Sequence, residues 1–439
     1  MEYKLTMLPF HNRRWPCFFL SLAMTRWVVF LLILAVGCRR IGPLDFQVRG
    51  DQAVTPDQGK QAGGDLRGRD RIASEPADNN AMGCELSVDP FICITPIAGP
   101  RNVVLFIGDG MGLAHMKAAS YYEYGAPDEI YFQAFDVRGM VTTAAANAEI
   151  TDSAAAATAM ACGRKVNQHV VGLAIPGDGS PLPNLTEYFK SVRKSTGLVT
   201  TATMTHATPA GFAAHTDHRG NTPEIAKDYL LETRPNVLFG GGGDGMTIEA
   251  AENADYTVID TLVDFDDSGL KDEVYLSGQF GNGYLPYEFF GLPEGLPHIW
   301  EMSEVAIRVL SRDPEGFFVM IEGARIDHAG HDNNFPVMVG ELTAFERAVK
   351  ESVTNGALSD DTLYIVTADH GTGGLVVEGG NGMGVLPDAH FTTTGHTDED
   401  VPIYVSGMGA EQFELVISAK GGLIDNTDIY RVLTELFLW

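Results

Sequence analysis

Three strongly apolar segments of this chain each lead into an acidic residue. The segments occupy residues 102–107, 317–321 and 363–367, and the acidic residues that follow them are Asp109, Glu322 and Asp369. An apolar run that stops at a carboxylate is typical of a buried parallel strand whose carboxyl end opens into a site. Open α/β sheets bind their ligands outside these strand ends. The pattern therefore predicts a parallel sheet with a metal centre of more than one ion at its carboxyl edge.

Length and composition limit the class of protein. The chain has 439 residues, which is enough for one large α/β domain or two of average size. Its hydrophobic fraction of 45% excludes a chain that is disordered throughout. The formal net charge of −28 argues against a nucleic-acid-binding role, because such proteins present a basic surface. The simplest explanation of the excess of acidic residues is that a charged surface keeps the protein soluble.

The N-terminal segment predicts export. From Met24 a short basic start precedes an apolar core that is too short to cross a bilayer, so residues 1–37 are expected to be a signal peptide, with Met24 as an alternative true start. The segment ends in a sequence that resembles a bacterial lipobox, which predicts a lipid on Cys38. The alternatives are an ordinary signal peptide with Cys38 there by chance, and a twin-arginine signal at Arg13-Arg14.

Residues 38–98 are rich in Gly, Asp, Gln and Arg and lack periodic apolar positions, which predicts a flexible, lipid-anchored tether. The folded catalytic domain is then expected over residues 99–439. Cys84 and Cys93 lie close together in the tether, and whether they pair depends on export. The expected location is the cell envelope, as a periplasmic or outer-membrane lipoprotein, or the medium if the chain carries no lipid.

Apolar runs alternate with helical periodicity from about residue 100 onward. Helices are expected after Gly112, over 144–161 and 184–194, and before the strands at 317–321 and 363–367; further strands are expected at 197–202 and 401–405. This alternation predicts an α/β fold with a central, mostly parallel sheet and helices on both faces.

Several side chains near the predicted strand ends can carry chemistry. Ser153 precedes an alanine-rich run, and the free N–H groups at a helix start suit a phosphate. On its own Ser153 is better explained as a helix cap, and the metal ligands change that balance. Asp327 and His331 have the i,i+4 spacing that places both on one helix face, where they can hold one metal ion. Asp369 and His370 are neighbours at a strand end, where a loop can turn both inward.

Three further residues complete the constellation. Thr208 follows a predicted strand and offers a hydroxyl ligand, Arg219 brings a positive charge, and His396 lies in a glycine-bearing loop before a strand. Taken alone, His396 is an ordinary surface histidine. The combination of these residues is more specific than any one of them alone.

The motifs around these residues resemble those of the alkaline phosphatase family. They are Gly-Asp-Gly-Met-Gly around Asp109, Asp-Ser-Ala around Ser153, Thr-His-Ala-Thr-Pro around Thr208, the stretch from His215 to Arg219, the stretch from Glu322 through Asp327 to His331, Thr-Ala-Asp-His ending at His370, and Gly-His-Thr around His396. They occur in the family order and cover about residues 100–410. Each motif alone is weak, and their combination is specific.

The resemblance implies a role for each residue. Ser153 would be the nucleophile, passing through a phosphoserine, and Arg219 would clamp the phosphate oxygens as a bidentate fork. Two zinc ions are implied, the first on Asp327, His331 and His396 and the second on Asp109, Asp369 and His370. A magnesium ion is implied on Asp109, Thr208 and Glu322. His206 and His328 would stand beside this third site; they either let zinc compete for it or merely hold water molecules.

The implied activity is hydrolysis of small phosphate monoesters to an alcohol and inorganic phosphate at alkaline pH. The segments from His206 to Glu322 and from His370 to His396 are short. Larger members of the family carry insertions there, some of which serve dimer contacts, so the sequence does not decide between a monomer and a homodimer. Rival interpretations are a phosphodiesterase or nucleotide pyrophosphatase, a sulfatase, and a lipid-anchored binding protein without turnover. Ser153 with its neighbouring alanines fits neither the usual threonine of the diesterases nor the sulfatase motif.

Overall fold

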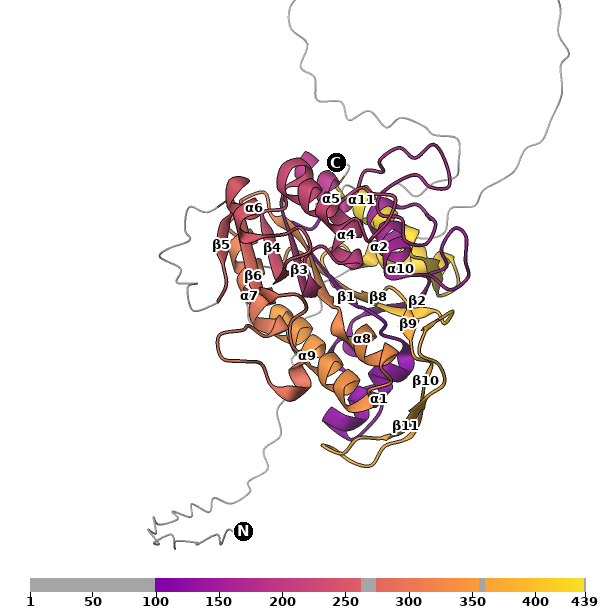
Figure 1. The fold of residues 1–439 in the computed structure, drawn as a ribbon. Coiled ribbons are helices and arrows are strands. Elements are labelled where there is room, and N and C mark those ends of the chain that lie inside the picture. The colour runs from indigo at the N-terminus through magenta and orange to yellow at the C-terminus, as the bar shows by residue number, and fades with distance from the viewer. Residues whose placement is uncertain (1–98, 262–273, 355–359, 438–439) are drawn as a thin grey trace, which may run out of the picture. The chain divides into compact units, whose positions relative to one another are not determined.

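The computed structural model describes residues 99–261, 274–354 and 360–437 (Figure 1). The predicted signal peptide, the lipid site at Cys38, the tether and the pair Cys84 and Cys93 all lie outside the described residues. Among the described helices, none combines the length and the apolarity that a bilayer span requires.

One large sheet forms the centre of the fold. Its ten strands run in the order β14-β2-β13-β8-β1-β7-β3-β4-β6-β5. Their bounds are β1 Asn102–Gly108, β2 Val137–Thr142, β3 Ser195–Thr203, β4 Val237–Gly242, β5 Thr257–Ile259, β6 Leu276–Asn282, β7 Phe317–Gly323, β8 Thr362–Ala368, β13 Val401–Gly407 and β14 Leu423–Asp425. All pairs are parallel except those of β13, which is antiparallel to both β2 and β8.

The three apolar segments of the sequence are neighbours at the middle of this sheet. β1 pairs in parallel with β7 on one side and β8 on the other, so that Val103 lies beside Phe318 and Leu363. Every residue of the three strands is buried. Strands that are covered on both faces need apolar side chains on both, which explains why these segments read as continuous apolar runs rather than alternating ones.

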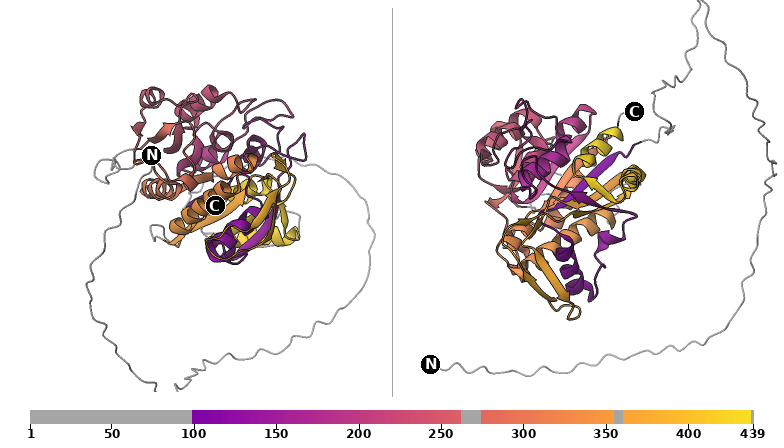
Figure 2. Two further views of the ribbon diagram at one scale, coloured as in Figure 1. Left: turned by 60° about the horizontal axis from the view of Figure 1, so that its bottom comes forward. Right: turned by 90° about the vertical axis from the view of Figure 1, so that its right-hand side faces the viewer.

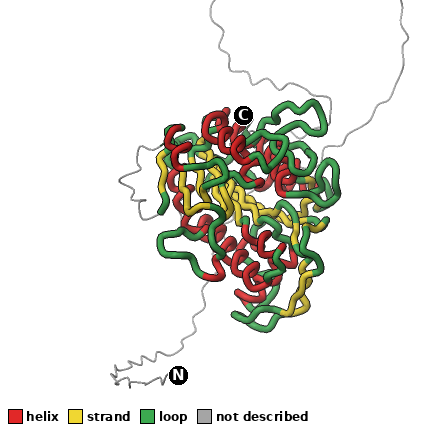
Figure 3. Tube along the Cα trace, in the orientation of Figure 1, coloured by secondary structure: helices red, strands yellow, loops and turns green. Residues whose placement is uncertain are grey.

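Helices cover both faces of the sheet, as predicted. Figure 1 shows α1 Leu113–Tyr124, α8 Arg325–His331 and α9 Phe335–Thr354 on one face, and α2 Ser153–Cys162, α4 Ala207–Ala213 and α11 Thr427–Glu435 on the other. The remaining helices are α3 Leu185–Ser191, α5 Thr222–Lys227, α6 Ile248–Asn253, α7 Ile299–Leu310 and α10 Ala410–Ala419, with the short turns η1 Tyr131–Ala134, η2 Asp228–Thr233 and η3 Glu288–Phe290. The strands form one layer between the helices in Figure 3.

Two small antiparallel pairs complete the described fold. β10 Leu375–Gly379 pairs with β11 Asp388–Phe391, and β9 Gly371–Thr372 pairs with β12 His396–Thr397. The hairpin of β10 and β11 lies beside α1 in the turned views as well (Figure 2). The pairing of β9 with β12 brings the loop of His396 back to the end of β8.

Helix α2 begins later than the sequence predicts. The expected helix over 144–161 starts at Ser153, because the side chain of Asp152 accepts a hydrogen bond from the backbone N–H of Ala155 at 3.2 Å and so caps the helix. The cap is therefore Asp152, and Ser153 is the first helical residue.

All of α2 is buried, and its small side chains let α4 approach closely. A methyl group added at Gly211 of α4 would lie 2.7 Å from the Cβ of Ala157. This close packing fixes the position of the helix that carries Ser153.

Candidate active site

The residues that the sequence singles out converge at the carboxyl ends of β1, β7 and β8. Asp109 follows β1, Glu322 lies near the end of β7, and Asp369 follows β8; all three side chains are fully buried. Asp369 accepts hydrogen bonds from the backbone N–H groups of Gly110 and His370, at 3.1 and 2.9 Å. These bonds tie the loop after β1 to the loop after β8.

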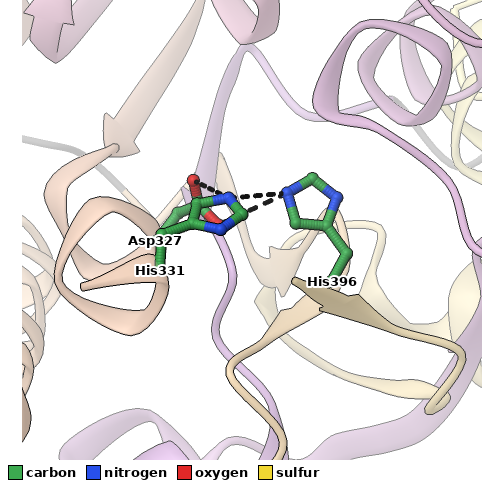
Figure 4. Close-up of side chains that lie close together, drawn as sticks. All are labelled: Asp327, His331 and His396. Atoms are coloured by element: carbon green, nitrogen blue, oxygen red, sulfur yellow. Dashed lines mark hydrogen bonds and ion pairs between the residues drawn. The ribbon is translucent and has the colours of Figure 1, made fainter. Parts of the chain in front are cut away.

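One group of ligands consists of Asp327, His331 and His396 (Figure 4). The Nε2 atoms of the two histidines lie 3.1 Å apart, and the Asp327 carboxylate oxygens lie 3.4 Å from Nε2 of His331 and 3.6 Å from Nε2 of His396. Asp327 and His331 come from one face of α8, as their spacing predicts. His396 comes from β12, about 70 residues further along the chain.

The tautomers of both histidines in this group leave Nε2 free to bind a cation. Nδ1 of His331 lies 2.6 Å from the carbonyl oxygen of Thr394, and Nδ1 of His396 lies 2.8 Å from that of Thr151. A carbonyl oxygen only accepts, so Nδ1–H is the donor in each case and Nε2 keeps its lone pair. Two lone pairs 3.1 Å apart repel one another unless a cation lies close to both. The hydroxyl of Thr372 fixes Asp327 in addition, at 2.5 Å from Oδ1.

A second group surrounds His370, which is also fully buried. Its Nε2 atom lies 3.2 Å from Oδ2 of Asp369, 3.5 Å from Oδ1 of Asp109 and 3.2 Å from Oγ of Ser153. Asp327 also has an oxygen within reach of this group. The structure thus brings together the predicted ligands Asp109, Asp369 and His370 and places the predicted nucleophile beside them.

A third group is formed by Asp109, His206 and Glu322, each of which offers one ligand atom within 4.8 Å of the others. Sequence reasoning placed His206 outside the ligand set and Thr208 within it. In the structure His206 comes within reach of Asp109 and Glu322. Thr208 is buried in the first turn of α4, and its hydroxyl is close enough to Glu322 to lower the pKa of that carboxyl. The residues of the third site therefore include a nitrogen donor as well as oxygens.

Burial and mutual repulsion control the charge of these carboxyl groups. Burial and then the charges of Asp369, Asp327 and Glu322 raise the pKa of Asp109 well above its usual range. Burial likewise raises the pKa of Glu322 to about 7 and raises that of Asp369. Both oxygens of Asp109 and Oε1 of Glu322 accept no hydrogen bond within the described part of the chain. Buried, crowded carboxylates without donors fit bound cations, which supply the missing positive charge.

Three histidines of the site, His206, His328 and His370, are neutral near pH 7. Burial lowers the pKa of His370 and of His206 well below the usual value, and it lowers the pKa of His328 to about 4. A neutral imidazole keeps one nitrogen lone pair, as a metal ligand must. The donor set of nitrogens and carboxylate oxygens is one that zinc accepts.

Asp152 is a residue that sequence reasoning missed, although it stands next to Ser153 in the motif. Besides capping α2, it lies 3.1 Å from Nη1 of Arg219 through Oδ2, and its Oδ1 accepts a hydrogen bond from the N–H of His169 at 3.0 Å. Burial opposes ionisation, but the bond from His169 and the charge of Arg219 outweigh it and lower the pKa of Asp152. Nη2 of Arg219 lies 3.3 Å from Nε2 of His206. Arg219 is therefore held between Asp152 and His206, close to the nucleophile.

Comparison with known proteins places this arrangement in one family. A family model described as alkaline phosphatase matches residues 100–264 and 243–390. Alkaline phosphatase 3 of Bacillus subtilis (strain 168) is 37% identical over 293 residues, covering 63% of this chain and 62% of that protein. Alkaline phosphatase 4 of the same organism is 28% identical and is covered to 88% of its length, against 76% of this chain. The chain thus spans less than two thirds of the first of these relatives.

A solved structure of a relative can be superposed on a larger share of this chain. The alkaline phosphatase from the Antarctic bacterium TAB5 superposes with a TM-score of 0.68 at 29% identity, covering 78% of this chain and 99% of that one. A variant of the TAB5 enzyme, with a histidine replaced by glutamate, is described with Mg bound in the M3 site. Since the family model covers well over half of the residues and the fold agrees, this chain belongs to the alkaline phosphatase family.

Proposed function

We propose that this protein hydrolyses small phosphate monoesters to an alcohol and inorganic phosphate through a phosphoserine intermediate at alkaline pH. One observation carries the proposal. The hydroxyl of Ser153 lies at the start of a buried helix, 3.2 Å from His370, among groups of side chains that can hold cations. Family membership supports the reaction class.

The chain's own residues supply binding and attack. The phosphoryl group would bind against the Arg219 guanidinium, which Asp152 orients at 3.1 Å, and against the free N–H groups at the start of α2. Oγ of Ser153 then forms a bond to phosphorus while the ester P–O bond breaks and the alcohol leaves. Water next attacks phosphorus, which frees Ser153 and releases inorganic phosphate. Holding the reacting groups in line is the main requirement for phosphoryl transfer.

Three cations would complete the site. Zinc suits the two groups that contain histidine beside Ser153, namely Asp327, His331 and His396, and Asp109, Asp369 and His370. Magnesium suits the oxygens of Asp109, Thr208 and Glu322. In the TAB5 relative, Mg in the M3 site is described for a variant in which glutamate replaces a histidine, whereas this chain has His206 beside its third site. When bound, such ions stabilise charge on the attacking and leaving oxygens and lower the pKa of water.

The proposal extends to location. The N-terminal sequence supports an exported protein that is anchored in the cell envelope through a lipid on Cys38. Its substrates would then be phosphate esters outside the cytoplasm.

Replacing Ser153 by Ala tests the reaction. The variant should lose at least roughly a thousandfold in kcat for an aryl phosphate, because the nucleophile is gone. Its metal content, measured by mass spectrometry, should stay at the parent level. The exposed Ser418 offers a matched control, since Ser418→Ala removes the same hydroxyl from α10 and should change neither quantity. Phosphate trapped by acid on a residue other than Ser153 would contradict the assignment.

Removing the metals should destabilise the protein more at high pH. In the metal-free protein, Asp109, Glu322 and Asp369 have folded-state pKa values above their unfolded values. The folded state therefore binds more protons, and its stability falls as the pH rises through these values, near pH 7 for Glu322. Urea unfolding with a chelator should give a lower free energy of unfolding at pH 9 than at pH 6, by on the order of 1–3 kcal/mol.

An isosteric variant isolates this effect from the large net charge of the chain. Asp109→Asn should reduce the loss at pH 9 and also reduce the gain on adding zinc. Asp136→Asn, at an exposed position, removes the same charge and should behave like the parent. Equal stability at both pH values with chelator would show that the carboxyl groups are not repelling one another.

The metal of the third site can be tested through its two histidines. His206 is within ligand distance of Asp109 and Glu322, and its ring lies 5.6 Å from that of His328. His206→Asp together with His328→Lys should raise the dependence of activity on added magnesium, since a carboxylate replaces a nitrogen ligand. Magnesium titration and metal analysis measure the change. A double variant that matches the parent would mean that these histidines only hold water molecules.

The anchor at Cys38 can be tested by fractionation of cells that express the full-length chain. Cys38→Ser should move the protein from the membrane fraction to the soluble or secreted fraction, because the lipid site is lost. Cys17→Ser, which lies upstream of the alternative start at Met24, is the matched control and should leave the distribution unchanged. A mature N-terminus beyond residue 38 without lipid would leave a plain secreted protein.

A further inference from the structure

A tyrosine that belongs to none of the sequence motifs lies beside the candidate active site. Tyr284 stands in the short connection between β6 and η3, and 51% of its surface is exposed. The next residue, Leu285, is buried in the core. An exposed ring beside a fully buried neighbour indicates a side chain that is held in place rather than one on a loose surface loop.

Two backbone hydrogen bonds hold the residues on either side of Tyr284. The N–H of Gly283 donates to the carbonyl oxygen of Gly242 at 3.0 Å, and the N–H of Leu285 donates to that of Thr201 at 3.0 Å. Gly283 has a φ of 106°, which favours glycine. A methyl group added at Gly241 would lie 1.6 Å from the carbonyl oxygen of Gly283. The connection is thus fastened to β3, which pairs with β7, and to β4, the next strand in the sheet.

The ring of Tyr284 packs on the two histidines beside the third metal site. Its centroid lies 4.6 Å from that of His328, with the planes tilted by 44°, and 5.9 Å from that of His206, with the rings at 88°. The guanidinium of Arg325 lies 5.4 Å from the same ring centroid. These contacts occupy part of the ring, and about half of the side chain remains open to solvent.

The side chain that would hold the phosphoryl group lies near this ring. Arg219, which would hold the phosphoryl group, has Nη2 at 3.3 Å from Nε2 of His206, so a single imidazole separates Arg219 from Tyr284. Ser153 is only 2% exposed, and Asp109, Glu322, Asp369 and His370 are fully buried. A leaving group attached to a phosphoryl group at this depth extends outward, and Tyr284 offers an exposed ring one imidazole away from Arg219.

We propose that Tyr284 is a specificity residue that stacks against the leaving group and favours phosphate monoesters of planar, aromatic alcohols. The inference rests on the proposed phosphatase function and names its preferred substrate class. A flat ring that is fixed by its backbone loses little freedom when a second ring stacks on it. A saturated ring of the same size gains less, because it lacks the flat π face.

Two matched phosphonates test the inference without turnover. Benzylphosphonate and cyclohexylmethylphosphonate have nearly the same size and differ in the flatness of the ring. With enzyme loaded with zinc and magnesium, calorimetry should show that Tyr284→Ala weakens binding of the benzyl compound by about fivefold and that of the cyclohexyl compound by less than about twofold. Tyr284→Phe keeps the ring and should restore the preference. Phe290→Ala, which removes a 70% exposed ring of η3, should bind both compounds as the parent does.

Inorganic phosphate separates this role from a structural one. Phosphate has no leaving group, so its dissociation constant and the metal content should be the same in the parent and in Tyr284→Ala. If Tyr284 acts only by supporting His206 and His328, all three ligands weaken together, and the inference is overturned. An equal loss for the benzyl and cyclohexyl compounds alone also overturns it.

The failure of the proposed function is recognised separately. A parent enzyme that binds phosphonates with the expected preference but never turns over phenyl phosphate would refute the phosphatase proposal and leave the role of Tyr284 in binding intact.

Discussion

The candidate site is shaped by the crowding of buried carboxyl groups at one edge of the sheet. Three adjacent parallel strands, β8, β1 and β7, end side by side, and each delivers an acidic residue to the same buried volume. In that volume burial, and then the charges of Asp369, Asp327 and Glu322, raise the pKa of Asp109. The apolar strands that make the core stable therefore also create a buried site that accepts positive charge.

Much of this arrangement follows from local patterns in the sequence. The uninterrupted apolar character of 102–107, 317–321 and 363–367 reflects burial on both faces, and it correctly predicted a mostly parallel sheet with helices on both sides. The i,i+4 spacing of Asp327 and His331 correctly placed both on one helix face. Such features can be predicted from the sequence because side chains repeat every 3.6 residues in a helix and every two residues in a strand, so nearby residues show the pattern.

Features that depend on distant parts of the chain were less predictable. The alanine-rich stretch favours helix throughout, yet α2 starts only at Ser153, where Asp152 provides a cap. His206 reaches Asp109 and Glu322 only because β1, β3 and β7 are packed side by side. Tyr284 lies in a glycine-rich connection without periodicity, and its place beside His328 is set by backbone bonds to β3 and β4. No local pattern encodes contacts of this kind.

Asp152 links two parts of the site that would otherwise be independent. One oxygen of its carboxylate caps the helix that carries Ser153, and the other holds Arg219. The hydroxyl of Ser153 and the guanidinium of Arg219 are therefore both positioned by one side chain. In the proposed reaction, one carboxylate would set the position of the nucleophile and of the phosphate-binding guanidinium together.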